Sequence, residues 1–330
     1  MLKGASEAFE DCLDEVVRFV GVEDFDVQRQ AGLLDEATEE FDPRALVGHT
    51  LGGAYTVTEV LGSGSFGCVL AARDIRTGGR LAIKMERRDA AVPQLEIEHR
   101  VLQELRTARL HRGIPDVYGL FELDCSEWVG RDGQVFTCLA MQYLGTTSLQ
   151  VLQDGGEVMS EQCLQDLGAQ CLERLRCVHR AGFVHRDVKP ENFMLWKGSV
   201  YLIDYGLAKR VVDPDTGEHE EYERKAPCGT PRYMSRHAHA NVMQTRRDDL
   251  EAFVYMMVSL CKGRLPWQHM PLEELPELKN NTPDERLCAG TPSYYAATLQ
   301  YVRGLRFTDM PDYGLLYSWW APAVTVSESR

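Results

Sequence analysis

Two short segments near residue 60 have the composition of β-strands joined by a turn. Residues 55–61 and 68–72 are rich in apolar and β-branched side chains, which is typical of strands. Residues 62–67, between them, include three glycines, and glycine adopts the backbone conformations that close a tight turn. Such a loop leaves backbone N–H groups free of side-chain obstruction, so it can close over the phosphates of a nucleotide.

The same glycine spacing also occurs in dinucleotide-binding folds, so the pattern alone is ambiguous. In those folds the glycines open a helix, whereas residues 62–67 join one predicted strand to another. The sequence therefore disfavours a nicotinamide cofactor.

The next apolar strand, residues 81–84, ends in a lysine that would be an ordinary surface residue if it stood alone. The distance of Lys84 behind the glycine turn places it beneath the phosphates instead. A helix is predicted at about residues 93–106, and four residues spaced i, i+3, i+7 and i+10 share its inner face. These residues are Leu95, Glu98, Leu102 and Leu105. We therefore predict an ion pair between Lys84 and Glu98 that positions the lysine for the α- and β-phosphates.

Two further elements follow. Residues 135–141 form a predicted strand, and the periodicity stops at residues 142–145, which we interpret as a hinge whose backbone groups meet adenine, with Met141 at the back of the pocket. Residues 160–181 form a long predicted helix with a buried face. Its apolar positions in helical phase are Cys163, Leu164, Leu167, Cys171, Leu175 and Val178.

Charged and amide side chains then occur at the spacing that protein kinases use. Asp187, Lys189 and Asn192 lie within residues 185–192, and Asp204 follows a short apolar run. Phosphoryl transfer needs an oriented alcohol and neutralised phosphate charge. We expect Asp187 to accept or orient the hydroxyl proton and Lys189 to balance the γ-phosphate. Asn192 and Asp204 would bind Mg²⁺, which prefers oxygen ligands.

These interpretations define an expected site for ATP and Mg²⁺. His185 and Tyr205 are expected to pack rather than to take part in the chemistry. A His-Arg-Asp tripeptide occurs by chance in many proteins, but its combination with the other motifs at this interval is specific. The residues expected to contact the nucleotide are Leu61, Gly62, Ser63, Gly64, Ser65, Phe66, Gly67, Val69, Ala82, Lys84, Glu98, Met141, Gln142, Tyr143, Leu144, Met194 and Ile203.

Composition agrees with a soluble enzyme of two lobes. The chain has 330 residues, 44% of them hydrophobic and 26% charged. No apolar run is long enough to span a bilayer, and the N-terminus has no signal-peptide pattern, so we expect a cytoplasmic or nuclear monomer. The ten cysteines lack paired CxxC spacing, which favours reduced, mostly buried thiols over disulfides or zinc ligands.

The formal net charge of −14 argues against binding to nucleic acid, whose phosphates require a basic surface. Residues 1–50 supply −9 of this charge, with thirteen Asp and Glu against four Lys and Arg. Apolar positions in this segment follow helical spacing, so it is either a helix packed on the body or a regulatory, partner-binding extension. Those positions are Phe9, Leu13, Val16, Val17 and Val20.

Several segments resemble the casein kinase I family, within a branch that includes the vaccinia-related and tau-tubulin kinases. The most specific are Arg-Arg-Asp-Asp-Leu-Glu at 246–251 and Leu-Pro-Trp-Gln at 265–268. The others lie at 62–67, 93–95, 113–115, 185–193, 203–209, 229–233, 305–307 and 311–313. The resemblance covers about residues 55–316. It implies a bilobal α+β Ser/Thr protein kinase in which Asp249, at the start of a buried helix, braces the catalytic loop.

The resemblance also indicates the domain boundaries of the chain and the positions at which its sequence differs from the family. We expect an acidic extension at 1–50, an N-lobe and hinge at 51–145, a C-lobe at 146–320 and a tail at 321–330. Like the family, the chain lacks Ala-Pro-Glu after the activation segment. Tyr205 replaces the commoner Phe, and its hydroxyl needs a partner if buried. The family's lysine-rich stretch after Leu-Pro-Trp-Gln is acidic at 271–278, with only Lys279 nearby.

The resemblance further implies an anion site that recognises phosphorylated or acidic protein substrates. Arg232 matches the family's arginine, and Arg186, Lys189 and Lys225 form a second basic group. Alternatively, Arg232 only braces the activation segment, and the acidic stretch favours a basic peptide. We also expect activity without phosphorylation of that segment, because acidic residues there can pair with Arg186, Arg224 or Lys225. These residues are Glu218, Glu220, Glu221 and Glu223.

Two classes of function remain: an active Ser/Thr protein kinase, and a pseudokinase that signals by binding. The five residues that pseudokinases usually lose are all present, which favours the enzyme. They are Lys84, Glu98, Asp187, Asn192 and Asp204. A small-molecule kinase is a third alternative, but the activation segment through Gly229 and Thr230 favours a peptide substrate.

Overall fold

The computed structural model describes residues 41–64, 67–125, 135–155, 159–224 and 228–321. These residues divide into two units. The β-rich unit holds the described residues up to Gln103 together with Pro115–Thr146, and the helical unit holds Glu104–Ile114 and the chain from Thr147 onward. The expected acidic helix near the N-terminus lies outside the described residues.

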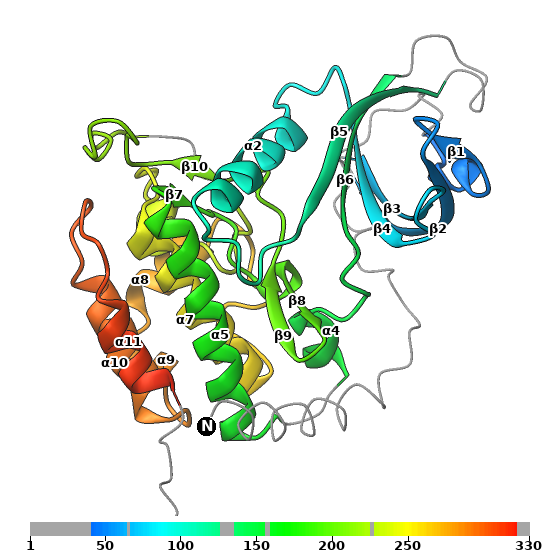
Figure 1. Cartoon of the computed structure of the whole chain (residues 1–330). Helices are drawn as coiled ribbons and strands as arrows, with labels where there is room; N and C mark the ends of the chain where they lie inside the picture. The colour runs from blue at the N-terminus through cyan, green and yellow to red at the C-terminus, as the bar shows by residue number, and fades with distance from the viewer. Residues whose placement is uncertain (1–40, 65–66, 126–134, 156–158, 225–227, 322–330) are drawn as a thin grey trace, which may run out of the picture. The chain divides into compact units, whose positions relative to one another are not determined.

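The β-rich unit is a six-stranded antiparallel sheet with the strand order β1-β2-β3-β4-β6-β5 (Figure 1). The helix α2 spans Gln94–Thr107, one residue later than the helical pattern predicts, and a 3-10 helix, η1, spans Pro43–Leu46. The strands are β1 (Thr50–Leu51), β2 (Tyr55–Gly64), β3 (Gly67–Asp74), β4 (Arg80–Arg87), β5 (Val117–Asp124) and β6 (Val135–Gln142).

The glycine-rich turn is shorter than the sequence suggests. Strand pairing continues through Gly62, Ser63 and Gly64, and Gly64 pairs with Gly67. Gly67 has φ +143°, and a Cβ atom added there would lie 1.9 Å from the carbonyl oxygen of Met85. Only glycine allows β3 to approach β4 this closely, so this position cannot accept a side chain without backbone movement. Ser65 and Phe66 lie outside the described residues.

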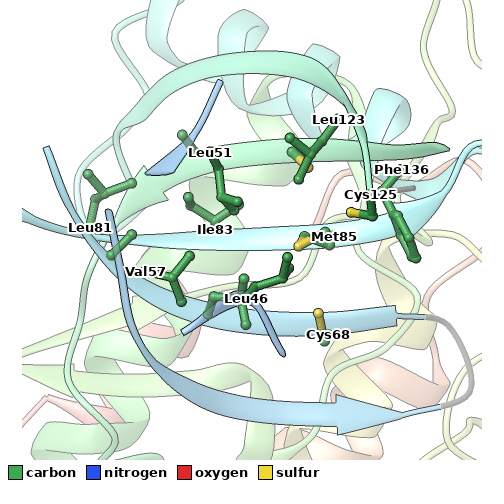
Figure 2. Close-up of a cluster of buried hydrophobic side chains, with 14 residues drawn as sticks. Leu46, Leu51, Val57, Cys68, Leu81, Ile83, Met85, Leu123, Cys125 and Phe136 are labelled. Carbon is green, nitrogen blue, oxygen red and sulfur yellow. The ribbon is translucent and has the colours of Figure 1, made fainter. Parts of the chain in front are cut away.

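The two faces of β4 have different partners, because side chains alternate along a strand. Leu81, Ile83 and Met85 point into a buried apolar cluster, which Figure 2 shows together with residues of the neighbouring strands. Leu46 of η1 and Leu51 of β1 belong to the same cluster and are fully buried. The sheet therefore includes chain that precedes the first strand expected from the sequence.

The helical unit is built around α7, Arg246–Lys262, which is buried on nearly all sides. The helix α5, Glu161–Arg180, packs against α7 and against the C-terminal helix α11, Tyr313–Trp320 (Figure 1). Its N-cap Ser160 accepts a hydrogen bond from the Cys163 N–H at 3.2 Å. The six apolar positions predicted for α5 are all buried, so the core assignment of this helix is confirmed.

Shorter elements complete the helical unit. The helices are α4 (Leu149–Asp154), η2 (Pro190–Asn192), α6 (Arg236–His239), α8 (Leu275–Asn281), α9 (Asp284–Leu287) and α10 (Ser293–Arg303). The strands are β7 (Phe183–Val184), β8 (Phe193–Trp196), β9 (Ser199–Leu202) and β10 (Lys209–Arg210). They form two small sheets, β10-β7 and β8-β9.

The nine cysteines in the described part of the chain are all free thiols, and seven of them are buried. This agrees with the prediction of reduced cysteines in the core. None of the helices in the described part of the chain has the length and hydropathy needed to cross a bilayer.

Candidate active site

The hairpin formed by β8 and β9 places Asn192 beside Asp204. Asn192 directly precedes β8, and Asp204 follows β9 by two residues. The Ile203 N–H donates to the Asn192 carbonyl at 2.9 Å, which joins the two ends of the hairpin. The backbone pairing therefore brings the chain at Asn192 and at Asp204 together, and both residues carry the oxygen ligands that a magnesium site uses.

The carboxylate of Asp187 is held by residues of its own loop and by the end of the activation segment. Its Oδ1 atom accepts hydrogen bonds from the Thr230 N–H and the Thr230 hydroxyl, both at 2.8 Å. Its Oδ2 atom accepts from Lys189 Nζ at 2.8 Å and from Asn192 Nδ2 at 3.2 Å. Lys189 Nζ also donates to the Thr230 hydroxyl oxygen at 3.0 Å. Asp187 and Lys189 thus have a fixed geometry, as the motif predicts.

Lys189 keeps its charge in this environment. Burial acts to lower the pKa of Lys189, but the carboxylates of Asp187, Glu191 and Asp204 outweigh burial, so the pKa is raised. A permanently charged ammonium between Asp187 and Thr230 suits the predicted role of balancing phosphate charge.

The close approach of the activation segment depends on Gly229. This residue has φ +98°, and a Cβ atom added to it would lie 2.3 Å from the Arg186 carbonyl oxygen. Arg186 and Asp204 themselves have left-handed φ angles of 68° and 67°. Such backbone conformations cost energy in residues other than glycine, and they persist where the surrounding contacts fix them.

Asp249 braces the catalytic loop from the first turn of α7. Its two carboxylate oxygens accept the backbone N–H groups of His185 at 2.7 Å and Arg186 at 2.8 Å. Asp249 Oδ2 also lies 2.9 Å from His179 Nε2. The brace that the family resemblance implies is therefore present.

This brace continues to the C-terminal helix. Burial lowers the pKa of His179, although Asp249 acts to raise it, so the imidazole is neutral near pH 7. Its Nε2–H donates to Asp249, which leaves Nδ1 to accept from the Tyr313 hydroxyl at 2.6 Å. Tyr313, His179 and Asp249 form a buried chain that ends at the backbone of the catalytic loop. The sequence analysis missed His179 and Tyr313.

His185 and Tyr205 pack as predicted. Both are fully buried, and their rings meet edge to face at 5.1 Å. His185 Nε2 lies 3.0 Å from the Ile203 carbonyl oxygen, and the Tyr205 hydroxyl donates to the Leu202 carbonyl at 3.2 Å. The extra hydroxyl of Tyr205 therefore has a partner.

In the β-rich unit, the predicted Lys84–Glu98 ion pair is confirmed. Lys84 Nζ lies 2.9 and 2.8 Å from the two carboxylate oxygens of Glu98, which is only 1% exposed. Glu86, two residues further along β4, points to the same side of the sheet. Its carboxylate accepts the backbone N–H groups of Gln94 and Leu95, both at 3.1 Å. One strand thus holds α2 at its N-terminus and at its middle.

Glu86, like His179 and Tyr313, was not predicted from the sequence. Helix N-termini attract negative charge because their first N–H groups lack partners within the helix. The signal available in the sequence was an acidic residue at the i+2 position from Lys84, on the strand face that meets α2. It was overlooked because nothing in the sequence of α2 indicates that its first N–H groups bind a side chain outside the helix.

Strand register brings several predicted nucleotide residues onto one face of the sheet. Val69 pairs with Lys84, and Ala82 pairs with Met141, and directly paired residues point to the same side. Gln142 ends β6, and the chain leaves regular structure at Tyr143 and Leu144, as expected for a hinge. Met194 in β8 and Ile203 after β9 belong to the helical unit. A nucleotide site that draws on both units stays a prediction.

The expected anion site is only partly described. Arg186 Nε donates to the Leu207 carbonyl at 2.6 Å, and Lys225 lies outside the described residues. Arg232 is half-buried, and its backbone oxygen accepts from Trp267 Nε1 at 2.8 Å. Lys279, the lysine beside the acidic stretch, is only 1% exposed, so it is not a surface cation for substrates. The packing of α8 turns this side chain into the core.

The acidic part of the activation segment pairs differently from the sequence prediction. Glu220 forms an ion pair with Lys209 of β10, whereas we expected Arg186, Arg224 or Lys225 as partners. Both residues of this pair are near the surface, where single ion pairs contribute little to stability. The segment is instead fixed at its other end, by the contacts of Thr230 with Asp187.

The model of the protein kinase domain family matches residues 55–288, which is well over half of the chain. A β-rich unit with a lysine–glutamate ion pair and a helical unit with an Asp–Lys–Asn loop are the two parts of such a domain. The chain belongs to the protein kinase domain family.

Proposed function

We propose that this protein is an ATP- and Mg²⁺-dependent Ser/Thr protein kinase of the casein kinase I type. The observation that carries the proposal is the arrangement around Asp187, whose carboxylate is oriented by Thr230, Lys189 and Asn192. A base held by several hydrogen bonds is positioned for the proton of an incoming hydroxyl. The resemblance at 246–251 and 265–268 supports the casein kinase I type.

The residues present fit a magnesium ion. Asn192 Nδ2 donates to the Asp187 carbonyl at 2.8 Å, so the amide is oriented with Nδ2 toward Asp187 and Oδ1 available as a ligand. Asn192 and Asp204 would hold the ion, and the phosphates of the substrate would complete its oxygen ligands. When bound, Mg²⁺ neutralises phosphate charge. Lys189 adds a positive charge, and Asp187 orients the acceptor hydroxyl and takes up its proton.

A transfer assay tests this proposal. Wild-type protein with γ-labelled ATP, Mg²⁺ and casein should yield labelled phosphoserine or phosphothreonine. Asp187→Asn should keep its thermal stability while the rate falls by about 100-fold or more, because an amide cannot take up the proton. Asp215→Asn, in an exposed loop, is the matched control and should keep full activity. Near-normal turnover of Asp187→Asn would remove that residue from its role.

Binding separates an active kinase from a pseudokinase that acts as a scaffold. Mg²⁺ with ATP should raise the Tm of the wild-type protein, because a ligand that binds only the native state stabilises it. The shift should shrink in Lys84→Met and in Asp204→Asn. Absence of any shift at millimolar ATP, together with no transfer, would favour the scaffold.

Substrate preference follows from the acidic stretch at 271–278. Glu273, Glu274 and Glu277 are exposed, and the only nearby lysine is buried. We therefore expect a weaker preference for substrates phosphorylated upstream of the target serine than the casein kinase I family shows. Any remaining preference should depend on Arg232 and decrease as salt rises. A primed and an unprimed peptide, compared for wild type and Arg232→Ala, test this.

A further inference from the structure

Lys279 is a buried ammonium group bound mainly by backbone oxygens. It lies in the last turn of α8, and its Nζ atom donates to the carbonyl oxygens of Pro231 and Met234, both at 2.7 Å. The third neighbour is His239 Nε2 at 3.1 Å. His239 Nε2 also lies 3.2 Å from the Pro231 carbonyl oxygen, so, according to its tautomer, it either accepts from Lys279 or donates to Pro231.

Aromatic rings close the rest of this site. Lys279 Nζ lies 5.2 Å from the ring centres of both Tyr255 and Trp267, within the range of a cation–π interaction. No carboxylate of the described residues forms an ion pair with this lysine. Trp267 Nε1 in turn donates to the Arg232 carbonyl at 2.8 Å. Lys279 and Trp267 together therefore bind three of the four carbonyls of residues 231–234.

The site tolerates a change in the charge of the lysine. Burial lowers the pKa of Lys279 to about 7, although Glu251 acts to raise it, and burial and Lys279 lower the pKa of His239 to about 4. His239 is thus neutral, and its Nε2 atom can accept from an ammonium or, as the other tautomer, donate to the Pro231 carbonyl oxygen or to a neutral amine. Both forms of Lys279 keep donating to Pro231 and Met234. The other titratable groups near this site are Arg236 and His237 on α6 and Tyr255 on α7.

Residues 231–234 border the place where a substrate must lie. They directly follow Thr230, whose hydroxyl and N–H bind the carboxylate of Asp187. A peptide hydroxyl presented to Asp187 would therefore lie next to Thr230, the residue that precedes this segment. The segment has no Ala-Pro-Glu sequence after it, and Ser235 is instead tied to Asp248 at 2.5 Å.

We propose that Lys279 is a positioning residue for the peptide substrate, which fixes residues 231–234 from the interior of the helical unit. The inference rests on the proposed kinase function, because it assigns a role within that activity. Lys279 does not touch substrate in this proposal. It acts only through the backbone that it binds, so its loss should affect peptide binding and leave nucleotide binding unchanged.

Hydrogen exchange tests the anchor without any need for activity. Lys279→Met keeps much of the length of the side chain but removes all its donors. Amide exchange in residues 230–236 should become at least about 10-fold faster in this variant, because the carbonyl bonds that hold the segment are lost. Lys262→Met is the matched control: this exposed lysine donates to one carbonyl, that of Leu287, at 3.1 Å. Unchanged exchange in a folded Lys279→Met protein would overturn the proposal.

Kinetics test the positioning role. In Lys279→Met, the KM for peptide should rise by about 10-fold or more, while the KM for ATP stays within about 2-fold of wild type. Equal changes in both constants would indicate general damage and would overturn the proposal. If Lys279→Met does not fold, His239→Ala removes one of the three partners of Lys279. This variant should also raise the KM for peptide more than the KM for ATP, by a smaller factor than Lys279→Met. If it changes both constants equally or neither of them, the proposal is wrong.

Different results would refute the proposed kinase function and the positioning role of Lys279. A wild-type protein that neither transfers phosphate nor hydrolyses ATP would refute the proposed function. The exchange experiment would still decide whether Lys279 anchors residues 231–234, since it measures the segment directly.

Discussion

Thr230 is the residue through which the activation segment meets the carboxylate of Asp187. Its hydroxyl donates to Asp187 and accepts from Lys189, so a substitution that keeps the hydroxyl should be tolerated. We expect Thr230→Ser to keep most of the activity and Thr230→Val to lower kcat by about 10- to 100-fold, because two polar contacts of charged groups are lost. Steady-state kinetics on casein check this, and equal rates for the two variants would contradict it.

The position of this hydroxyl also excludes Thr230 as an activating phosphorylation site. A phosphate there would lie against the carboxylate of Asp187, and like charges at hydrogen-bond distance repel. Thr230→Glu should therefore be inactive, and treatment with a phosphatase should not lower the activity of the wild-type protein. Activity that rises with phosphorylation at Thr230 would contradict this geometry.

At the scale of elements, the attachment of α2 to β4 yields a further prediction. Glu86→Gln weakens the two charge-assisted bonds to the first turn of α2, so the helix should hold Glu98 less firmly against Lys84. We expect kcat/KM for ATP to fall by about 10-fold. Glu96→Gln, an exposed acid in the same turn, is the control and should have little effect.

A double substitution shows whether Glu86 acts through the ion pair. If it does, Glu86→Gln should have almost no further effect in a protein that already carries Glu98→Gln. Additive losses from the two changes would mean that Glu86 supports the fold in some other way.

The elements also show what the sequence can and cannot reveal. The Lys84–Glu98 pair was predictable because the helical period fixes which side of α2 faces inward, and the nearest lysine lies on the preceding strand. The burial of Lys279 was not predictable, because the local pattern of α8 is acidic and polar, and only the packing of α8 against residues 231–234 buries this lysine. The partner of Glu220 was predicted wrongly for a similar reason. The pairing of β10 with β7 sets the position of Lys209, and no local sequence pattern indicates this pairing.

At the scale of the whole molecule, Lys279 couples stability to pH. In the unfolded chain this lysine keeps its proton up to about pH 10.5, whereas in the folded protein its pKa is about 7. Between these values the unfolded state binds more protons, so this group makes the folded state more stable as pH rises. The Tm of wild type relative to Lys279→Met should therefore increase from pH 7 to pH 9. A constant difference across that range would contradict the lowered pKa.

The family match begins at residue 55 and ends at residue 288. The chain cannot be shortened to these residues without loss of part of its core. A chain that begins at Tyr55 would lose Leu46 and Leu51 from the apolar cluster in Figure 2 and expose the face of β4 to water. A chain that ends at Cys288 would lose α10 and α11, and with them Trp320, whose ring packs directly against Gly168 of α5. Shortened proteins with these ends should aggregate on expression, since each cut turns part of a core into an exposed apolar surface. For anyone producing the enzyme, the useful limits lie before Phe41 and after Trp320.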